Sequence, residues 1–231
     1  MSRALFVTGT GTDVGKTYIA ALLVKKLAAS GRNAGYFKAA MSGNVRRADG
    51  SLIPGDAQFV RQISGIAQPL EEICPYVYER ACSPHLAARI EGHPVEPEVV
   101  KQRYAAVCCR YDFVTVEGSG GILCPLRFDE KIRFGLDELV RELGLASVIV
   151  ADAGLGTINS VVLTAEAMQA RGLPVRGVIF NRYHPADAME EDNIRMCELL
   201  TGLPTLARVQ PGDADIRLDA PEALYEEVRN P

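Results

Sequence analysis

A lysine and a threonine follow a glycine-rich segment near the start of the chain, Gly9-Thr10-Gly11-Thr12-Asp13-Val14-Gly15-Lys16-Thr17. Glycines let a backbone curl until several N–H groups point at one anion, and a following helix adds the positive end of its dipole. Lys16 would then reach the β- and γ-phosphates of a nucleotide, and the Thr17 hydroxyl would ligate Mg²⁺. The segment predicts a phosphate-binding loop in which the first glycine, Gly9, stands one residue earlier than in the common pattern.

Three carboxylates could face such a loop. Glu117 follows the apolar run Phe113–Val116 and precedes Gly118–Gly121, where bare backbone leaves room for a ligand. This setting favours a metal or phosphate contact over a charge in solvent. Asp56 suits either a helix N-cap or a second carboxylate for Mg²⁺. Asp152 leaves the same alternatives open and has no other support.

Two further polar side chains follow apolar runs. Lys38 comes after Ala34–Phe37 and could neutralise charge on a transferred phosphoryl group, although a solvated surface lysine is the alternative. Asn181 comes after Val175–Phe180, and an amide can form the paired hydrogen bonds that adenine N6 and N7 require. None of the three histidines stands at a metal-ligand spacing.

The elements that must position these side chains alternate along the chain. Strands are expected at Ala4–Val7, Ala34–Phe37, Phe113–Val116, Ser147–Ala151, Val175–Phe180 and Leu206–Val209. Helices are expected from Tyr18 to about Ser30 and at Asp56–Ile63, Pro84–Gly92, Glu96–Cys109, Leu136–Leu143, Asn159–Arg171, Ala188–Leu200 and Pro221–Val228, with a long loop at Ser42–Gly55 and an irregular stretch at Pro69–Tyr78. This alternation predicts an α/β fold with a mostly parallel sheet and helices on both faces. Ligands of such sheets bind beyond the carboxyl ends of the strands, where we expect Gly9–Thr17, Lys38, Glu117, Asp152 and Asn181 to gather.

Composition limits the class of protein. A chain of 231 residues suits one α/β domain covering residues 1–231. The net charge of −4 argues against nucleic acid as a partner. No apolar run approaches the roughly 18 residues of a membrane span, and no signal peptide is evident, so we expect a cytoplasmic protein without membrane association. The six cysteines form no C-x-x-C pair, which favours reduced thiols over zinc or disulfides.

Together these motifs resemble the dethiobiotin synthetase family. The matching segments are the loop Gly9–Thr17, Lys38–Gly43, Gly55-Asp56, Ser83-Pro84-His85, Glu117–Gly121 with Pro125-Leu126, Leu155–Asn159, Asn181 and Pro211. They span most of the chain in the order expected for the family. Ala39, Ser119 and Ser160 depart from the residues usual there, and these changes affect loop shape more than charge.

The resemblance implies a homodimer with the fold of P-loop NTPases and a Mg²⁺- and ATP-dependent ligase. Such an enzyme joins CO₂, supplied by bicarbonate, to 7,8-diaminononanoate and closes the ureido ring of dethiobiotin, releasing ADP and phosphate. The reaction passes through a carbamate and a carbamic-phosphoric anhydride.

Site roles carry over by matching position. Lys16 and Lys38 would be catalytic and hold phosphate and carbamate charge. Thr17, Asp56 and Glu117 would bind the metal. The nucleotide would contact Asp13, Val14, Gly15, Lys16, Thr17, Tyr18, Asp56, Glu117, Gly118, Ser119, Gly120, Asn181, Pro211, Gly212 and Asp213, with Asn181 and Pro211 at the adenine. Thr12 and Ser42 would contact the diamine, and Gly156 and Thr157 its carboxylate across the dimer.

Two other classes are less consistent with the sequence. An amidoligase of the cobyrinate-synthase type would carry a glutaminase domain with a cysteine nucleophile, and Cys124 lacks the glycines that usually flank one. A switch ATPase of the partitioning or septum-positioning type would have a lysine near the start of the loop, where Thr10 and Gly11 stand. A strong basal ATPase without diamine would favour the switch.

Overall fold

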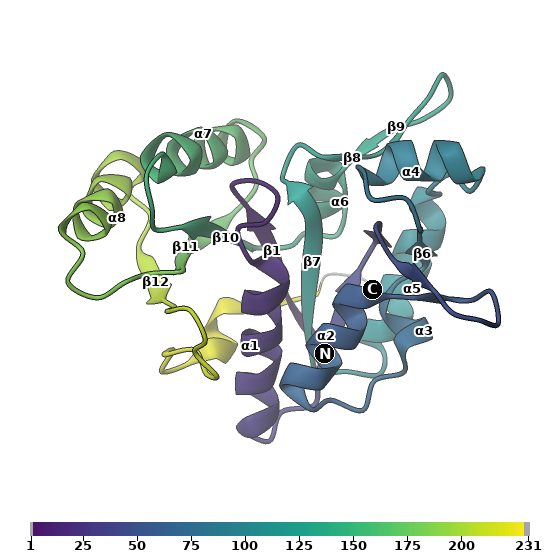
Figure 1. Cartoon of the computed structure of the whole chain (residues 1–231), viewed down its shortest axis with the longest axis horizontal. Coiled ribbons are helices and arrows are strands. Elements are labelled where there is room, and N and C mark those ends of the chain that lie inside the picture. Colours follow the sequence, from purple (N-terminus) through teal and green to yellow (C-terminus); the bar gives the residue numbers. More distant parts are fainter. Residues whose placement is uncertain (1, 229–231) are drawn as a thin grey trace.

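The apolar runs form the centre of a mostly parallel sheet in the computed structural model, which describes residues 2–228 (Figure 1). Its strands within those residues are β1 (Arg3–Gly9), β2 (Ala34–Lys38), β7 (Phe113–Gly121), β10 (Ser147–Asp152), β11 (Val175–Asn181), β12 (Thr205–Arg208) and β13 (Glu226–Glu227). The order is β12-β11-β10-β1-β7-β2, and β13 pairs antiparallel with the beginning of β1. The predicted parallel sheet is confirmed.

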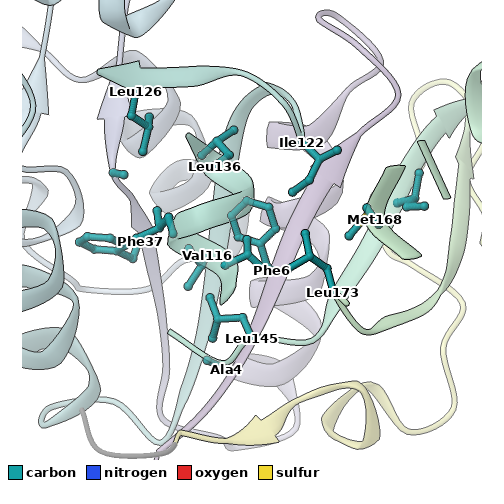
Figure 2. Close-up of a cluster of buried hydrophobic side chains, with 14 of the residues drawn as sticks. Ala4, Phe6, Phe37, Val116, Ile122, Leu126, Leu136, Leu145, Met168 and Leu173 are labelled. Atoms are coloured by element: carbon teal, nitrogen blue, oxygen red, sulfur yellow. The ribbon is translucent and has the colours of Figure 1, made fainter. Parts of the chain in front are cut away.

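Helices cover both faces of this sheet. They are α1 (Lys16–Ala29), α2 (Gly55–Ser64), α3 (Leu70–Ile73), α4 (Pro84–Glu91), α5 (Pro97–Cys108), α6 (Leu136–Glu142), α7 (Thr157–Ala170), α8 (Ala188–Thr201) and the 3₁₀ helix η1 (Pro221–Leu224). One buried cluster joins Leu5 and Val7 of β1 to α1 and α2. The other joins Phe6 of β1, Phe37 and Val116 to helices of the opposite face, as Figure 2 shows. Alternate residues of each strand therefore pack against the helices on opposite faces of the sheet. This explains why the central strands are apolar throughout.

The strand after α5 is longer than predicted. We expected it to end before Glu117, but β7 continues to Gly121, where it still pairs with Gly9 of β1. The glycines make this possible, because a Cβ at Gly118 would stand 2.8 Å from the Phe6 ring. Glu117 consequently lies inside a strand and not at its end.

The predicted helix at Pro221–Val228 is wrong. Only η1 is helical there, and β13 follows it. Tyr225 decides the conformation, because it is buried, its hydroxyl lies 2.6 Å from the Thr115 hydroxyl, and its ring packs edge-on against Phe113. These contacts to a distant strand override the local helical pattern.

Short elements occupy stretches for which no regular structure was predicted. They are β3 (Ala40–Met41), β4 (Val45–Arg46), β5 (Leu52–Ile53), β6 (Tyr76–Val77), β8 (Pro125–Phe128) and β9 (Arg133–Gly135), besides α3. β4 and β5 form a hairpin in the long loop before α2, and β8 and β9 form another after β7. Within the described residues no helix is long and apolar enough to span a membrane.

Candidate active site

The glycine-rich segment connects β1 to α1, as its sequence predicts. Gly15 has φ of 89° and immediately precedes the helix, and a side chain there would place its Cβ 2.1 Å from the Asn181 amide nitrogen. Asp13 also lies in the left-handed region, with φ of 63°. The loop is therefore held in one conformation both by backbone torsions and by close packing against the end of β11.

Two lysines face the loop, in different electrostatic settings. The Lys16 ammonium donates to the Gly11 carbonyl at 2.7 Å, and burial lowers the pKa of Lys16 although the charge of Glu117 opposes this. Burial also acts to lower the pKa of Lys38, but the charges of Glu117 and Asp56 outweigh it and raise this pKa above its usual value. Lys38 is therefore a fixed cation at neutral pH.

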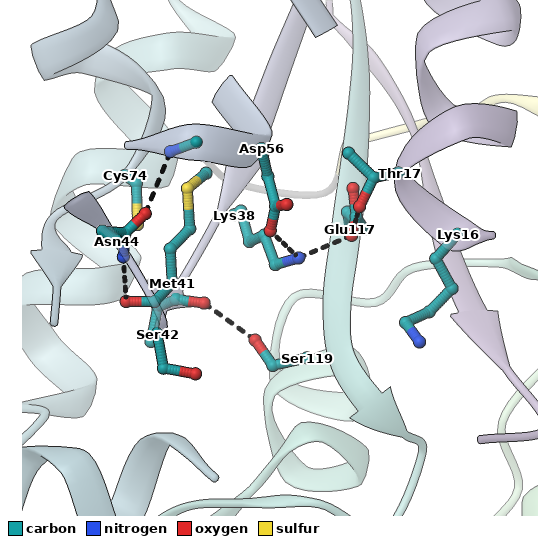
Figure 3. Close-up of polar contacts among 12 residues, drawn as sticks. Lys16, Thr17, Lys38, Met41, Ser42, Asn44, Asp56, Cys74, Glu117 and Ser119 are labelled. Carbon is teal, nitrogen blue, oxygen red and sulfur yellow. Dashed lines mark hydrogen bonds and ion pairs between the residues drawn. The ribbon is translucent and has the colours of Figure 1, made fainter. Parts of the chain in front are cut away.

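Strand register brings Lys38 to Glu117. β2 and β7 are parallel neighbours, and Lys38 lies directly beside Glu117 in the pairing. The Lys38 Nζ lies 2.5 Å from Glu117 Oε1 and 2.7 Å from Asp56 Oδ2 (Figure 3). Thr17, at the start of α1, donates to the same Glu117 oxygen at 2.8 Å. Glu117 and Lys38 are both buried, so this ion pair depends on its hydrogen-bonded geometry.

The oxygens at this point fit Mg²⁺. Hydroxyl and carboxylate oxygens from Thr17, Asp56 and Glu117 meet around one ammonium group, so the site already favours a cation. Mg²⁺ prefers such hard oxygen ligands and usually takes one or two carboxylates plus phosphate oxygens. No group of three His, Cys, Asp or Glu side chains that could hold a metal occurs in the described residues.

Asp56 is not the N-cap of its helix. Pro54 holds that position in α2, and the Asp56 carboxylate in the first turn points to Lys38. Of the two alternatives that the sequence left open, the geometry favours the one in which Asp56 faces the site.

These groups line a cavity of about 530 Å³. Eleven of the predicted site residues line it, namely Thr12, Asp13, Gly15, Lys16, Thr17, Lys38, Ser42, Asp56, Glu117, Ser119 and Gly120. Ser42 donates to the Cys82 carbonyl at 2.6 Å, and Ser119 donates to the Ala40 carbonyl at 2.8 Å. Both serines are thus held by backbone carbonyl groups, one of them in β3 (Ala40–Met41).

Nine predicted residues do not line this cavity. They are Val14, Tyr18, Gly118, Asn181, Pro211, Gly212, Asp213, Gly156 and Thr157. Asn181 donates to the Val14 carbonyl of the phosphate loop at 3.1 Å, and the Tyr18 hydroxyl of α1 donates to the Asp213 carbonyl. Gly118 packs so closely against the Phe6 ring that the position has no room for a side chain. The roles of these nine in ligand binding, like those of the eleven that line the cavity, stay predictions.

Sequence reasoning missed Arg182. This residue lines the cavity, has φ of 52°, and donates to the Asp13 carbonyl at 2.7 Å. Its other nitrogen lies 2.6 Å from Asp152, which gives that carboxylate an ion-pair partner and no contact with the proposed metal residues. An arginine directly after the strand that ends at Asn181 could have indicated such a contact.

Tyr36 was also missed. Its hydroxyl donates to Glu117 Oε2 at 2.6 Å, but a tyrosine within an apolar run looks like an ordinary core residue. The spacing of two residues between Tyr36 and Lys38 would have placed both on one face of the strand.

The parallel sheet, the loop between β1 and α1 and the lysines beside it define a P-loop nucleotide-binding protein. A ParA family ATPase from Chlorobium tepidum shares this fold, with a TM-score of 0.54 at 16% identity over 92% of this chain and 84% of the ATPase. A family model described as an AAA domain matches residues 3–215.

Two named relatives show to which family of P-loop proteins the chain belongs. An ATP-dependent dethiobiotin synthetase BioD from Brachyspira hyodysenteriae is 43% identical over 98% of this chain and all of its own length. Another from Clostridium kluyveri is 44% identical over 91% of this chain and 86% of the relative. The chain belongs to the dethiobiotin synthetase family.

Proposed function

We propose that this protein is an ATP-dependent ligase that forms dethiobiotin from 7,8-diaminononanoate and CO₂, with release of ADP and phosphate. The observation that carries the proposal is the pair of buried lysines on one cavity, which Thr17, Asp56 and Glu117 also line. Lys16 belongs to the phosphate loop, and Lys38 sits with Asp56 and Glu117. Such a cavity suits transfer of a phosphoryl group to a negatively charged acceptor.

Thr17, Asp56 and Glu117 would hold Mg²⁺, which would neutralise charge on the β- and γ-phosphates when bound. Lys16 would contact the same phosphates from the loop. Lys38 is the cation nearest to the metal residues and faces the same cavity as Ser42. It would stabilise the negative charge of the carbamate and of the phosphoryl group during transfer.

The family resemblance implies the following course of the reaction, and the arrangement is consistent with it. One amine of the substrate takes up CO₂ to give a carbamate, whose oxygen attacks the γ-phosphorus and displaces ADP. The second amine then attacks the carbonyl carbon of the resulting anhydride, phosphate leaves, and the ring closes. Thr12 and Ser42 would orient the diamine, because both line the same cavity as the two lysines.

The carboxylate of the diamine would bind at the turn before α7. Gly156 precedes this helix with φ of 90°, and the buried hydroxyl of Thr157 has no hydrogen-bond partner among the described residues. Helix N-terminal N–H groups favour anions. Asn193 fixes the approach to the turn by donating to the carbonyls of Ala153 and Gly154 at 3.0 and 3.1 Å.

This turn does not line the cavity of its own chain. We therefore propose that it serves the cavity of a second subunit, in a homodimer with shared sites. Leu155, whose side chain is exposed in the single chain at 90%, would be covered in that dimer.

The test is ADP release from ATP and Mg²⁺, measured with and without diaminononanoate and bicarbonate. We expect release to require both, with dethiobiotin formed in equal amount. Strong ATP hydrolysis that neither compound alters would instead indicate a switch ATPase and contradict the proposal.

A further inference from the structure

The two carboxylate oxygens of Glu117 have different partners. Oε1 accepts from Thr17 and lies 2.5 Å from Lys38, on the side of the cavity. Oε2 accepts a hydrogen bond of 2.6 Å from the Tyr36 hydroxyl, which is inside the protein. Tyr36 and Glu117 are both essentially inaccessible to solvent.

The position of Tyr36 follows from the pairing of β2 with β7. Tyr36 lies beside Thr115, and Lys38 lies beside Glu117. Side chains two residues apart share a face of a strand, so Tyr36 and Lys38 approach Glu117 from the same side of the sheet. Phe37 points to the opposite face and joins the other core cluster.

We propose that Tyr36 is a positioning residue, which holds the Glu117 carboxylate so that Oε1 faces the metal and phosphate position. Rotation of the carboxylate about its last bond would exchange the two oxygens or turn both away from Thr17. A donor fixed to Oε2 prevents this rotation. Partners that orient a metal ligand in this way typically affect metal affinity or activity by about 10- to 100-fold.

Tyr36 is held at two points, its hydroxyl and its backbone. The backbone N–H of Tyr36 is held separately, by Gln68 at 2.8 Å. A phenylalanine would therefore keep the ring and the backbone contact and lose only the bond to Glu117.

The inference rests on the proposed magnesium site, and the experiment is Tyr36→Phe. Isothermal titration calorimetry with an ATP analogue that cannot be hydrolysed between its β- and γ-phosphates measures binding in EDTA and in Mg²⁺. We expect the affinity in EDTA to match the wild type within about twofold, and the affinity in Mg²⁺ to fall about 10-fold or more. The Mg²⁺ concentration for half-maximal ADP release should rise by a similar factor.

Tyr104→Phe is the matched control. Tyr104 is equally buried but packs against Phe37 on the opposite face of the sheet. Its loss of a hydroxyl should leave both affinities unchanged. Unchanged Mg²⁺-dependent binding in folded Tyr36→Phe would overturn the inference, as would an equal loss in EDTA and Mg²⁺.

The double variant Tyr36→Phe with Glu117→Gln tests whether Tyr36 acts through Glu117. It should need no more Mg²⁺ than Glu117→Gln alone, and a further increase would contradict the inference. If Tyr36→Phe alone does not fold, the double variant should fold, because it no longer buries a carboxylate without its donor; failure of both would also refute the idea. Calorimetry needs no diamine, so a wild type that binds nucleotide with Mg²⁺ but makes no dethiobiotin would reject the proposed function alone.

Discussion

Replacing Lys38 by methionine tests stability and chemistry together. The change keeps an unbranched side chain of similar length and removes the cation between Glu117 and Asp56. Glu117 would remain buried without its partner cation and would keep its hydrogen bonds from Thr17 and Tyr36. Breaking a buried ion pair by removing one partner generally costs about 3–5 kcal/mol. We take about 3 kcal/mol because the pair adjoins a cavity that water can enter.

For a chain of this size, 1 kcal/mol corresponds to about 2–4 °C, so Tm should fall by about 6–12 °C. Activity should fall by about 10²–10³-fold at saturating substrates, because Lys38 faces the charge that develops during transfer. Differential scanning calorimetry measures the first effect, and diamine-dependent ADP release measures the second.

Two further variants separate the causes. Lys38→Met combined with Glu117→Gln removes both charges and should recover most of the lost stability while remaining inactive. Lys101→Met is the control, since Lys101 pairs with Glu98 and Glu142 at the surface and should change stability by less than about 1 kcal/mol. A stable Lys38→Met protein, or a double variant less stable than the single one, would refute the reasoning. Near-normal activity of Lys38→Met would show that Lys38 does not stabilise the charge that develops during transfer.

Three other predictions concern the metal, the dimer and pH. Asp56→Asn should raise the Mg²⁺ concentration for half-maximal activity. If that concentration does not change, Asp56 does not bind the metal. Inactive Gly156→Glu and Lys16→Ala proteins should regain activity when their subunits exchange, whereas no recovery despite exchange would place each site within one chain. The hydrogen bond to Glu190 raises the pKa of His184 above 6.5, so its stabilising effect is complete below pH 6.5 and is lost as pH rises through the folded-state pKa. An NMR titration should show this midpoint above 6.5 and a lower one in Glu190→Gln; equal midpoints would contradict it.

The phosphate loop could be predicted because its signal is local. Glycines, a lysine and a threonine between an apolar run and a helical pattern describe one turn of chain, and the structure places that turn between β1 and α1. The central strands and most helices were predictable for the same reason, since periodicity reports burial within a short window. The end of the chain was not, because Tyr225 takes its conformation from Thr115, which lies 110 residues away.

Contacts at the site depend on which strands are neighbours. Lys38 and Glu117 are separated by 79 residues, and Thr17 and Glu117 by 100. Lys38 and Glu117 could each be proposed from a place after an apolar run, and Thr17 from the phosphate-loop motif. Their meeting requires β7 to lie between β1 and β2. No local pattern in the sequence indicates this order of strands.

Residues that act through another residue are therefore the hardest to predict. Tyr36 has no contact with the cavity, and its bond to Glu117 exists only because β2 and β7 are in one particular register. A shift by one residue would turn Tyr36 and Lys38 to the opposite face together. The same pairing thus sets both the cation at Oε1 and the donor at Oε2. Any change that disturbs this register should impair metal binding and phosphoryl transfer at once, even though it touches no ligand.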